Sequence, residues 1–212
     1  MLSLVLVLQG CITIEENYTF KKDGSGAMEY VVDMSELADL MNGLPGAKDK
    51  NEGMGKLDLI ENLTRLQAIT GISKVKVAKE KDGFIQRLSF RFTDVTALNG
   101  ALNEIITDST AAGPKEFFRW EGSTLVASTK GRTKGMGNSM GGGSEDSTSA
   151  EGMLKMMKYK FDMRFAEELG DVLTAESMHK EPEGTKRMKL STDWSVLDQD
   201  STALDMRFTL KR

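Results

Sequence analysis

Residues 157–165 carry the pattern that most constrains the fold of this chain. Apolar and charged side chains alternate along the segment, and the apolar set is Met157, Tyr159, Phe161, Met163 and Phe165. A period of two residues is typical of a β-strand with one buried face and one face in water. Because antiparallel sheets commonly have one wet face, we expect an antiparallel sheet here.

Two further pairs of alternating segments are each joined by a short turn that contains Asp-Gly. In the first pair, residues 21–26 form the turn between strands over residues 12–20 and 28–34. In the second pair, residues 81–83 form the turn between strands over residues 75–77 and 88–92. Glycine accepts the positive φ angles that tight turns require, so both pairs are predicted to be β-hairpins. A helical pattern follows each pair, and a duplicated ββα unit is one hypothesis that this order allows.

Apolar residues at helical spacing predict helices over residues 35–41, 57–66 and 95–106. Asp94 stands directly before the last of these and can cap its amino end. Further strands are expected over residues 117–127, 172–178, 187–192 and 204–210. The sequence therefore predicts an α+β fold in which antiparallel β-sheets of hairpins pack with two to three helices.

Composition changes sharply over residues 131–150, which consist mainly of Gly, Ser, Thr and Met. This segment has too few bulky apolar residues to offset the entropy of ordering it, so we expect a flexible loop. Outside the loop, residues 17–212 are expected to form a single globule. Two lobes divided near residue 113 are an alternative organisation.

Cys11 is the only cysteine and follows an apolar run over residues 2–8. The segment Leu8-Gln9-Gly10-Cys11 resembles the bacterial lipobox, which implies cleavage between Gly10 and Cys11 and attachment of a diacylglyceryl group to the thiol. Residues 1–10 would then be a signal peptide, truncated or degenerate because they contain no Lys or Arg, and residues 11–16 a lipidated tether. The alternative is that Cys11 is a small residue buried in the hydrophobic core.

A wider resemblance covers the first 35 residues or so. The segments Cys11-Ile12-Thr13-Ile14-Glu15-Glu16-Asn17-Tyr18-Thr19-Phe20, Asp23-Gly24-Ser25-Gly26 and Met28-Glu29-Tyr30-Val31-Val32-Asp33-Met34-Ser35 resemble lipoproteins of Bacteroidetes-type bacteria that have no known activity. The resemblance implies attachment to an envelope membrane, with the domain in the periplasm or outside the cell. Ile12 is not the Asp that retains enteric lipoproteins at the inner membrane, so the outer membrane is expected. The resemblance supplies no catalytic residues.

Composition excludes several classes of function. A single cysteine allows no internal disulfide, and a net charge of −4 without a basic stripe argues against a nucleic-acid partner. His179 is the only histidine, so zinc sites built on paired histidines are excluded, and a solvated loop is its expected setting. Ser177 and Lys180 match S-x-x-K without the companion motifs of penicillin-recognising enzymes.

Other candidate motifs are incomplete. Residues 135–141 begin like a dinucleotide fingerprint but have Met140 at the third glycine position. Residues 198–202 have the spaced oxygens of a calcium loop without its glycine and bidentate acid. Adjacent acids at Glu15-Glu16 and Glu167-Glu168 would face opposite sides of a strand, so neither pair is expected to be a catalytic dyad. We therefore expect no catalytic residue, no metal and no cofactor.

We expect a non-catalytic binding or scaffolding domain, concentrated near its partner by the anchor. Its partners would be the membrane, through the acyl chains, and an envelope protein or small ligand. One alternative is an envelope hydrolase that uses Asp and Glu residues. The other is copper binding by clustered thioethers, at Met136, Met140, Met153, Met156 and Met157.

Overall fold

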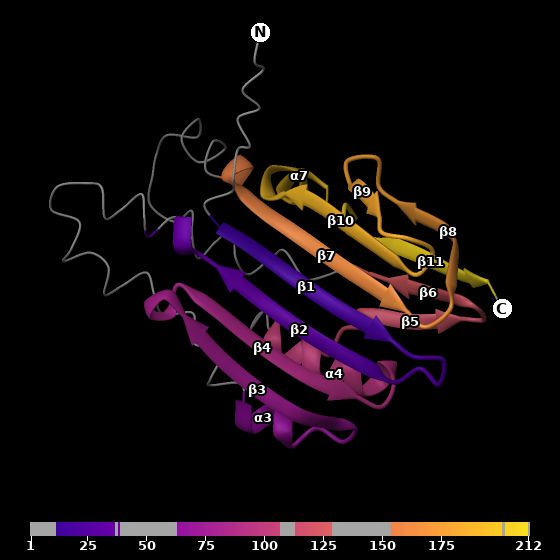
Figure 1. Ribbon diagram of the computed structural model, residues 1–212, viewed down its shortest axis with the longest axis horizontal. Helices are drawn as coiled ribbons and strands as arrows, with labels where there is room; N and C mark the ends of the chain where they lie inside the picture. The colour runs from indigo at the N-terminus through magenta and orange to yellow at the C-terminus, as the bar shows by residue number, and fades with distance from the viewer. Residues whose placement is uncertain are drawn as a thin grey trace, which may run out of the picture.

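The computed structural model describes residues 12–36, 38, 63–106, 113–128, 154–200 and 202–211. These residues form two β-sheets with short helices, in agreement with the α+β prediction (Figure 1). The expected signal peptide over residues 1–10, Cys11 and the expected loop over residues 131–150 lie outside the described part of the chain.

The larger sheet has seven strands in the order β3-β4-β2-β1-β7-β10-β9. Their bounds are β1 Ile12–Phe20, β2 Gly26–Asp33, β3 Ile72–Glu80, β4 Ile85–Phe92, β7 Met157–Phe165, β9 His179–Pro182 and β10 Arg187–Asp193. The larger sheet contains strands that come before residue 113 in the sequence and strands that come after it. The two sheets therefore do not correspond to two parts of the chain divided at that residue.

The smaller sheet has four strands in the order β5-β6-β11-β8 and lies behind the larger sheet in Figure 1. Its strands are β5 Phe118–Glu121, β6 Thr124–Ala127, β8 Glu168–Thr174 and β11 Met206–Lys211. All its strand pairs are antiparallel.

The helices are short: α3 Leu63–Gln67, α4 Val95–Ile105 and α7 Trp194–Gln199, with a 3-10 turn at Lys81–Gly83. Further helical turns lie at residues 35–36 and 38 and at residues 154–156, so the described residues hold more helical segments than the two to three expected. Asp94 caps α4 as predicted, because its carboxylate accepts a 2.9 Å hydrogen bond from the backbone N–H of Ala97. None of the described helices is long and apolar enough to cross a membrane.

Both predicted hairpins are confirmed. Strands β1 and β2 are antiparallel, and Asp23 fixes their turn by accepting hydrogen bonds from the backbone N–H and the hydroxyl of Ser25, at 3.0 and 2.7 Å. Strands β3 and β4 are antiparallel around the turn at Lys81–Gly83.

One pair in the larger sheet corrects the antiparallel prediction. Strands β1 and β7 are parallel, with Ile12 beside Met157 and Phe20 beside Phe165. The two strands lie far apart in the sequence, so no tight turn dictates opposite directions. Alternation along one strand determines which face is buried, and it carries no information about the direction of the neighbouring strand.

The first strand spans residues 12–20, as the alternation predicts, and this leaves no separate tether over residues 12–16. Residues 12–16, which were expected to be part of the tether, form the start of β1, and Ile12, Ile14 and Glu16 are buried. They belong to the sheet because their side chains meet the core and their backbone pairs with both β2 and β7. Among the described residues, therefore, the sheet begins one residue after Cys11.

One hydrophobic core lies between the two sheets and α4. Aromatic rings connect the layers: Phe20 stacks on Phe165 at 5.6 Å between ring centroids, and Phe165 packs against Phe208 of the smaller sheet at 5.4 Å. Met157 and Met163 fill the same core. The opposite face of the seven-stranded sheet consequently carries the polar side chains.

Candidate functional site

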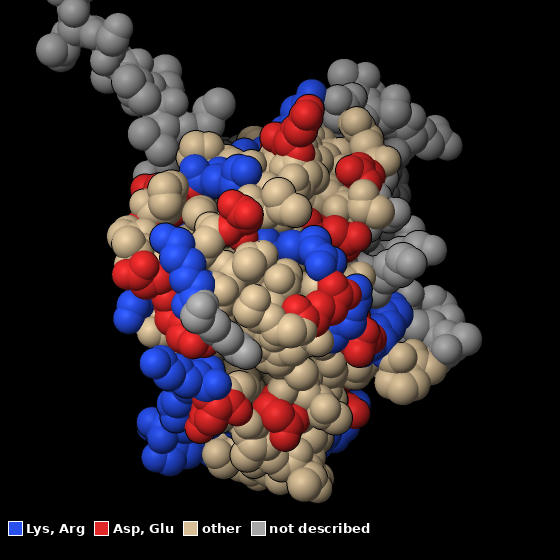
Figure 2. Space-filling model, turned by 90° about the vertical axis from the view of Figure 1, so that its right-hand side faces the viewer, with Lys and Arg blue, Asp and Glu red and all other residues tan. Residues whose placement is uncertain are grey.

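The face of the seven-stranded sheet that points away from the core, called here the outer face, is polar across its width. Because side chains alternate along each strand, every buried core position has an outward neighbour. The outward side chains include Glu15, Asn17, Glu29, Arg87, Ser89, Arg91, Lys160, Asp162, Arg164, Arg187 and Lys189. Figure 2 shows the molecule from the side, with basic and acidic side chains interspersed.

Three hollows lie on the outer face in the described part of the chain. One hollow of about 590 Å³ crosses from β3 to β10 and is lined by seven Lys or Arg residues and three Asp or Glu residues; we call it the cationic hollow. A second, of about 730 Å³, lies toward the start of β1, where Thr13 and Lys158 line it. A third, of about 290 Å³, includes His179 and Glu181. The cationic excess of the first hollow contrasts with the net negative charge of the whole chain.

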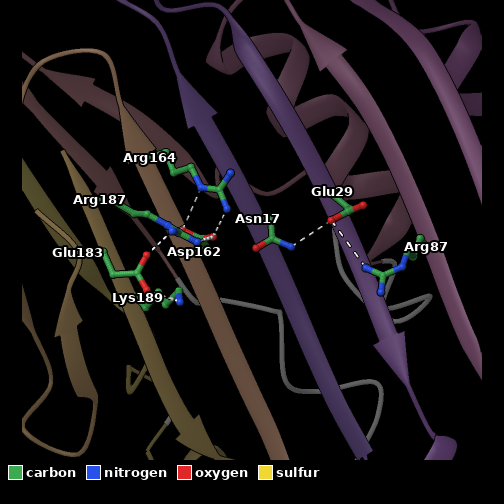
Figure 3. Close-up of polar contacts among 8 residues, drawn as sticks. All are labelled: Asn17, Glu29, Arg87, Asp162, Arg164, Glu183, Arg187 and Lys189. Carbon is green, nitrogen blue, oxygen red and sulfur yellow. Dashed lines mark hydrogen bonds and ion pairs between the residues drawn. The ribbon is translucent and has the colours of Figure 1, made fainter.

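Asp162 is the centre of an ion-pair cluster at one side of the cationic hollow (Figure 3). Arg187 donates from Nε to Oδ1 and from Nη2 to Oδ2, both at 2.7 Å, and Arg164 donates from Nη2 to Oδ2 at 2.6 Å. Arg187 also pairs with Glu183, which in turn pairs with Lys189. The carboxylate of Asp162 is almost fully buried, and two guanidinium groups neutralise it.

These contacts keep the carboxyl groups of the cluster ionised. Burial alone would raise the pKa of Asp162, but hydrogen bonds from Arg187 and Arg164 and their positive charges outweigh it and hold that pKa below its ordinary value. The hydrogen bond from Lys189 lowers the pKa of Glu183. The hydrogen bond to Asp162 raises the pKa of Arg187. Near neutral pH, neither acid is therefore suited to donate a proton.

A second polar chain crosses the middle of the outer face. Asn17 donates from Nδ2 to Glu29 at 3.2 Å, and Arg87 lies 3.9 Å from the same carboxylate and 2.9 Å from Glu80. The Oδ1 atom of Asn17 is buried and has no hydrogen-bond partner in the part of the chain that the structure describes. Turning the amide over would place this oxygen against the Glu29 carboxylate, so the orientation shown is the favourable one.

Strand β3 contributes two lysines to the cationic hollow, Lys74 and Lys76. The pairing of β3 with β4 shifts register between Ser73 and Lys76, which marks a β-bulge. Lys74 lies in this bulge with a φ of 54°, in the left-handed region that lysine seldom adopts. The signal for the bulge is in the sequence, because Ile72, Val75 and Val77 all pack on the core although the first two are three residues apart.

Glu16, which the sequence presents only as a neighbour of Glu15, is a buried acid. It lies on the core face of β1, fully buried, and accepts hydrogen bonds from the hydroxyls of Tyr18 and Tyr159. Its position could have been predicted, since it falls in the alternating series with Ile14 and Tyr18. Glu15 points to the outer face instead, so the two adjacent acids face opposite sides of the strand, as predicted.

His179 is exposed, and it belongs to β9, where the sequence predicted a loop. The strand forms because its backbone pairs with β10, with His179 beside Ser191. Ser177 and Lys180 are also exposed. Asp200 accepts hydrogen bonds from the backbone N–H and hydroxyl of Thr202 at 2.8 and 2.7 Å, which makes a local turn after α7.

Several candidate residues lie outside the described part of the chain: Gly10, Cys11, residues 135–141, Met136, Met140 and Met153. Met157 is buried in the core, whereas Met156 is 44% exposed, so these two thioethers do not face the same way. Among the residues described, no three His, Cys, Asp or Glu side chains are grouped to hold a metal ion.

Comparison with known proteins gives no family for the chain. No protein-family model and no curated protein matches it. The NMR structure of the folded domain of LppM from Mycobacterium tuberculosis is similar over 96% of this chain and 91% of that chain, with 12% identity and a TM-score of 0.43. This likeness is too distant to assign a function, and the resemblance to Bacteroidetes-type lipoproteins stays a prediction from the sequence.

Proposed function

We propose that this protein is a lipid-anchored binding protein of the bacterial envelope, attached to a membrane through Cys11 and binding its ligand on the outer face without catalysis. The observation that carries the proposal is the outer face itself. Polar side chains from neighbouring strands converge there on hollows of several hundred Å³. Sites built on strands hold their side chains more precisely than sites on loops, which suits recognition.

The state of the acids favours binding over hydrolysis. A glycosidase-type hydrolase needs one carboxyl group that is protonated at working pH and a second that is free to act as base or nucleophile. In the cationic hollow, Asp162 is held by two arginines, and Glu29 is in contact with Asn17 and Arg87. Such paired carboxylates fix the positions of their arginines, which can then contact a ligand with their remaining donors.

The sequence around Cys11 supports the anchor. The lipobox-like segment ends at Cys11, and β1 begins at Ile12, the next residue. An acylated Cys11 would thus be joined directly to the central part of the larger sheet. Such a short connection would hold the outer face close to the membrane and raise the effective concentration of any ligand present there.

Acetylation of lysines in the native envelope tests this proposal although the ligand itself is unidentified. The reagent is a water-soluble acetyl ester, and the rate at each lysine is followed by mass spectrometry. Purified full-length protein in liposomes of the same lipids is the reference. We expect Lys76 and Lys160 on the outer face to react more slowly in the envelope than in liposomes, because a bound ligand covers them.

Lys186 and Lys211 are the internal controls. Both are exposed, Lys186 in the turn before β10 and Lys211 on the smaller sheet. They should react at the same rate in both preparations. If Lys76 and Lys160 also reacted equally in both, the outer face would not be the ligand surface and the proposal would fail.

A further inference from the structure

The β3–β4 side of the cationic hollow carries positive charge that the protein does not neutralise. Within the described residues, Lys74, Lys76 and Arg91 are in no ion pair, whereas the arginines at positions 87, 164 and 187 all are. All three unpaired cations are exposed. Unpaired charges of one sign that share a hollow raise the local potential, so this end attracts anions.

Pairing between β3 and β4 brings these three side chains together. Ser73 lies beside Arg91 and Lys76 beside Ser89, so Arg91 and Lys76 are diagonal neighbours across the two strands. Diagonal neighbours are about 7 to 8 Å apart at Cα, which lets long side chains converge on one small group. Ser89, which lies directly opposite Lys76, also lines the hollow, and its hydroxyl is a further hydrogen-bond donor.

The bulge adds Lys74 to this set. Lys74 and Val75 together face the single residue Phe90, and Val75 thereby reaches the core. Glycine would make the same bulge without the cost of about 1 kcal/mol that a residue with a Cβ has in the left-handed region. The core therefore explains the bulge, but it does not explain a lysine in it. Strained residues of this kind cluster at binding sites.

We propose that Lys74, Lys76 and Arg91 bind a phosphate group of the ligand. Two ammonium groups and one guanidinium group provide more charge than a single carboxylate needs, and they match a phosphate, which carries up to two negative charges. Lysine and arginine are both regular phosphate ligands, as a point charge and as a bidentate donor. This inference rests on the proposed function of the outer face and adds the chemistry that the face recognises.

The phosphate has two possible sources, a soluble molecule or a lipid headgroup, and two probes separate them. The full chain carrying Cys11→Ser is titrated with inorganic pyrophosphate by calorimetry, and it is mixed with phosphatidylglycerol vesicles in a sedimentation assay. Binding of pyrophosphate supports a soluble phosphate ligand. Binding of the vesicles without binding of pyrophosphate supports a lipid headgroup as the ligand. Binding of neither probe overturns the inference.

Matched variants locate the binding. Lys76→Ala with Arg91→Ala should weaken binding of the active probe about tenfold or more, since each removes a charge-assisted hydrogen bond. Lys186→Ala with Lys211→Ala changes the net charge equally, away from the three cations, and should leave the affinity close to that of the parent. Equal weakening by both pairs would show non-specific attraction and overturn the assignment.

Lys74→Gly separates a binding role from a structural one. It should weaken probe binding about threefold while raising the urea midpoint, because glycine relieves the strain of the left-handed conformation. Unchanged affinity in this variant would remove Lys74 from the site. If the lysines of the outer face are protected in the native envelope but neither phosphate probe binds, the phosphate assignment fails and the proposed function stands.

Discussion

Arg187 holds Asp162 with two parallel hydrogen bonds of 2.7 Å, from Nε to Oδ1 and from Nη2 to Oδ2. The two residues belong to neighbouring strands, β10 and β7, and Asp162 lies beside Lys189 in the register. The contact therefore runs diagonally and fastens the two strands on the outer face. Fork-to-fork pairs of this kind are the strongest and most specific of the charged hydrogen bonds in proteins.

Asp162→Asn should lower the free energy of unfolding by about 2 kcal/mol, because two guanidinium groups lose their shared, nearly buried counter-charge. Urea unfolding at pH 7 measures the change. Asp171→Asn is the matched control, since Asp171 is exposed on β8 and should change stability by less than about 0.5 kcal/mol. Equal losses in the two variants would mean that the cluster contributes nothing specific.

Stability should fall in acid through the same cluster. Asp162 and Glu183 have native pKa values below their ordinary ones, so the unfolded chain binds more protons than the folded chain at low pH. Their contribution is complete above about pH 5 and is lost as the pH falls below about 4. Urea midpoints measured at pH 7, 5 and 3 check this, and Asp162→Asn should reduce the fall between pH 5 and pH 3.

Asn99 of α4 joins the helix to the start of β5. Its Oδ1 accepts from the backbone N–H groups of Phe117 and Phe118 at 3.0 and 2.8 Å, and its Nδ2 donates to the carbonyl of Phe118 at 2.8 Å. Asn99→Ala should lower the free energy of unfolding by about 3 kcal/mol. Asn99→Asp keeps the accepted bonds and loses the donated one, so it should lie between the parent and Asn99→Ala. The reverse order would contradict this account of the contact.

Gly26 and Gly24 in the first hairpin should respond differently to alanine. A Cβ on Gly26 would lie 2.0 Å from the carbonyl oxygen of Thr19 and 2.4 Å from the ring of Phe92, whereas Gly24 has open space around it and a φ of +83°. We expect Gly26→Ala to lower the free energy of unfolding by about 3 kcal/mol. Gly24→Ala should lower it by about 1 kcal/mol. Thermal unfolding of both variants measures the difference, and similar losses would show that the backbone relaxes around residue 26.

Alternation predicted the buried face of β7, alternation with Asp-Gly turns predicted the hairpins, and helical spacing after Asp94 predicted the cap. All three depend on residues close together in the sequence. The parallel pairing of β1 with β7 could not be predicted, since it depends on which distant strands share a core. The outer face was missed for a related reason. Asp162 and Arg187 each look like an ordinary solvated charge until the sheet places them side by side. The bulge at Lys74 was predictable in principle from the spacing of Ile72 and Val75.

The central claim is that Cys11 tethers this protein to a membrane. The most direct test expresses the chain, with a competent signal peptide, in a bacterial host that processes lipoproteins. The intact mass of the protein is then measured in the membrane fraction. We predict a chain that begins at Cys11 and carries the added mass of two or three acyl chains. Cys11→Ser should give an uncleaved chain without that mass. An unmodified parent chain, with the same processing as Cys11→Ser, would contradict the claim.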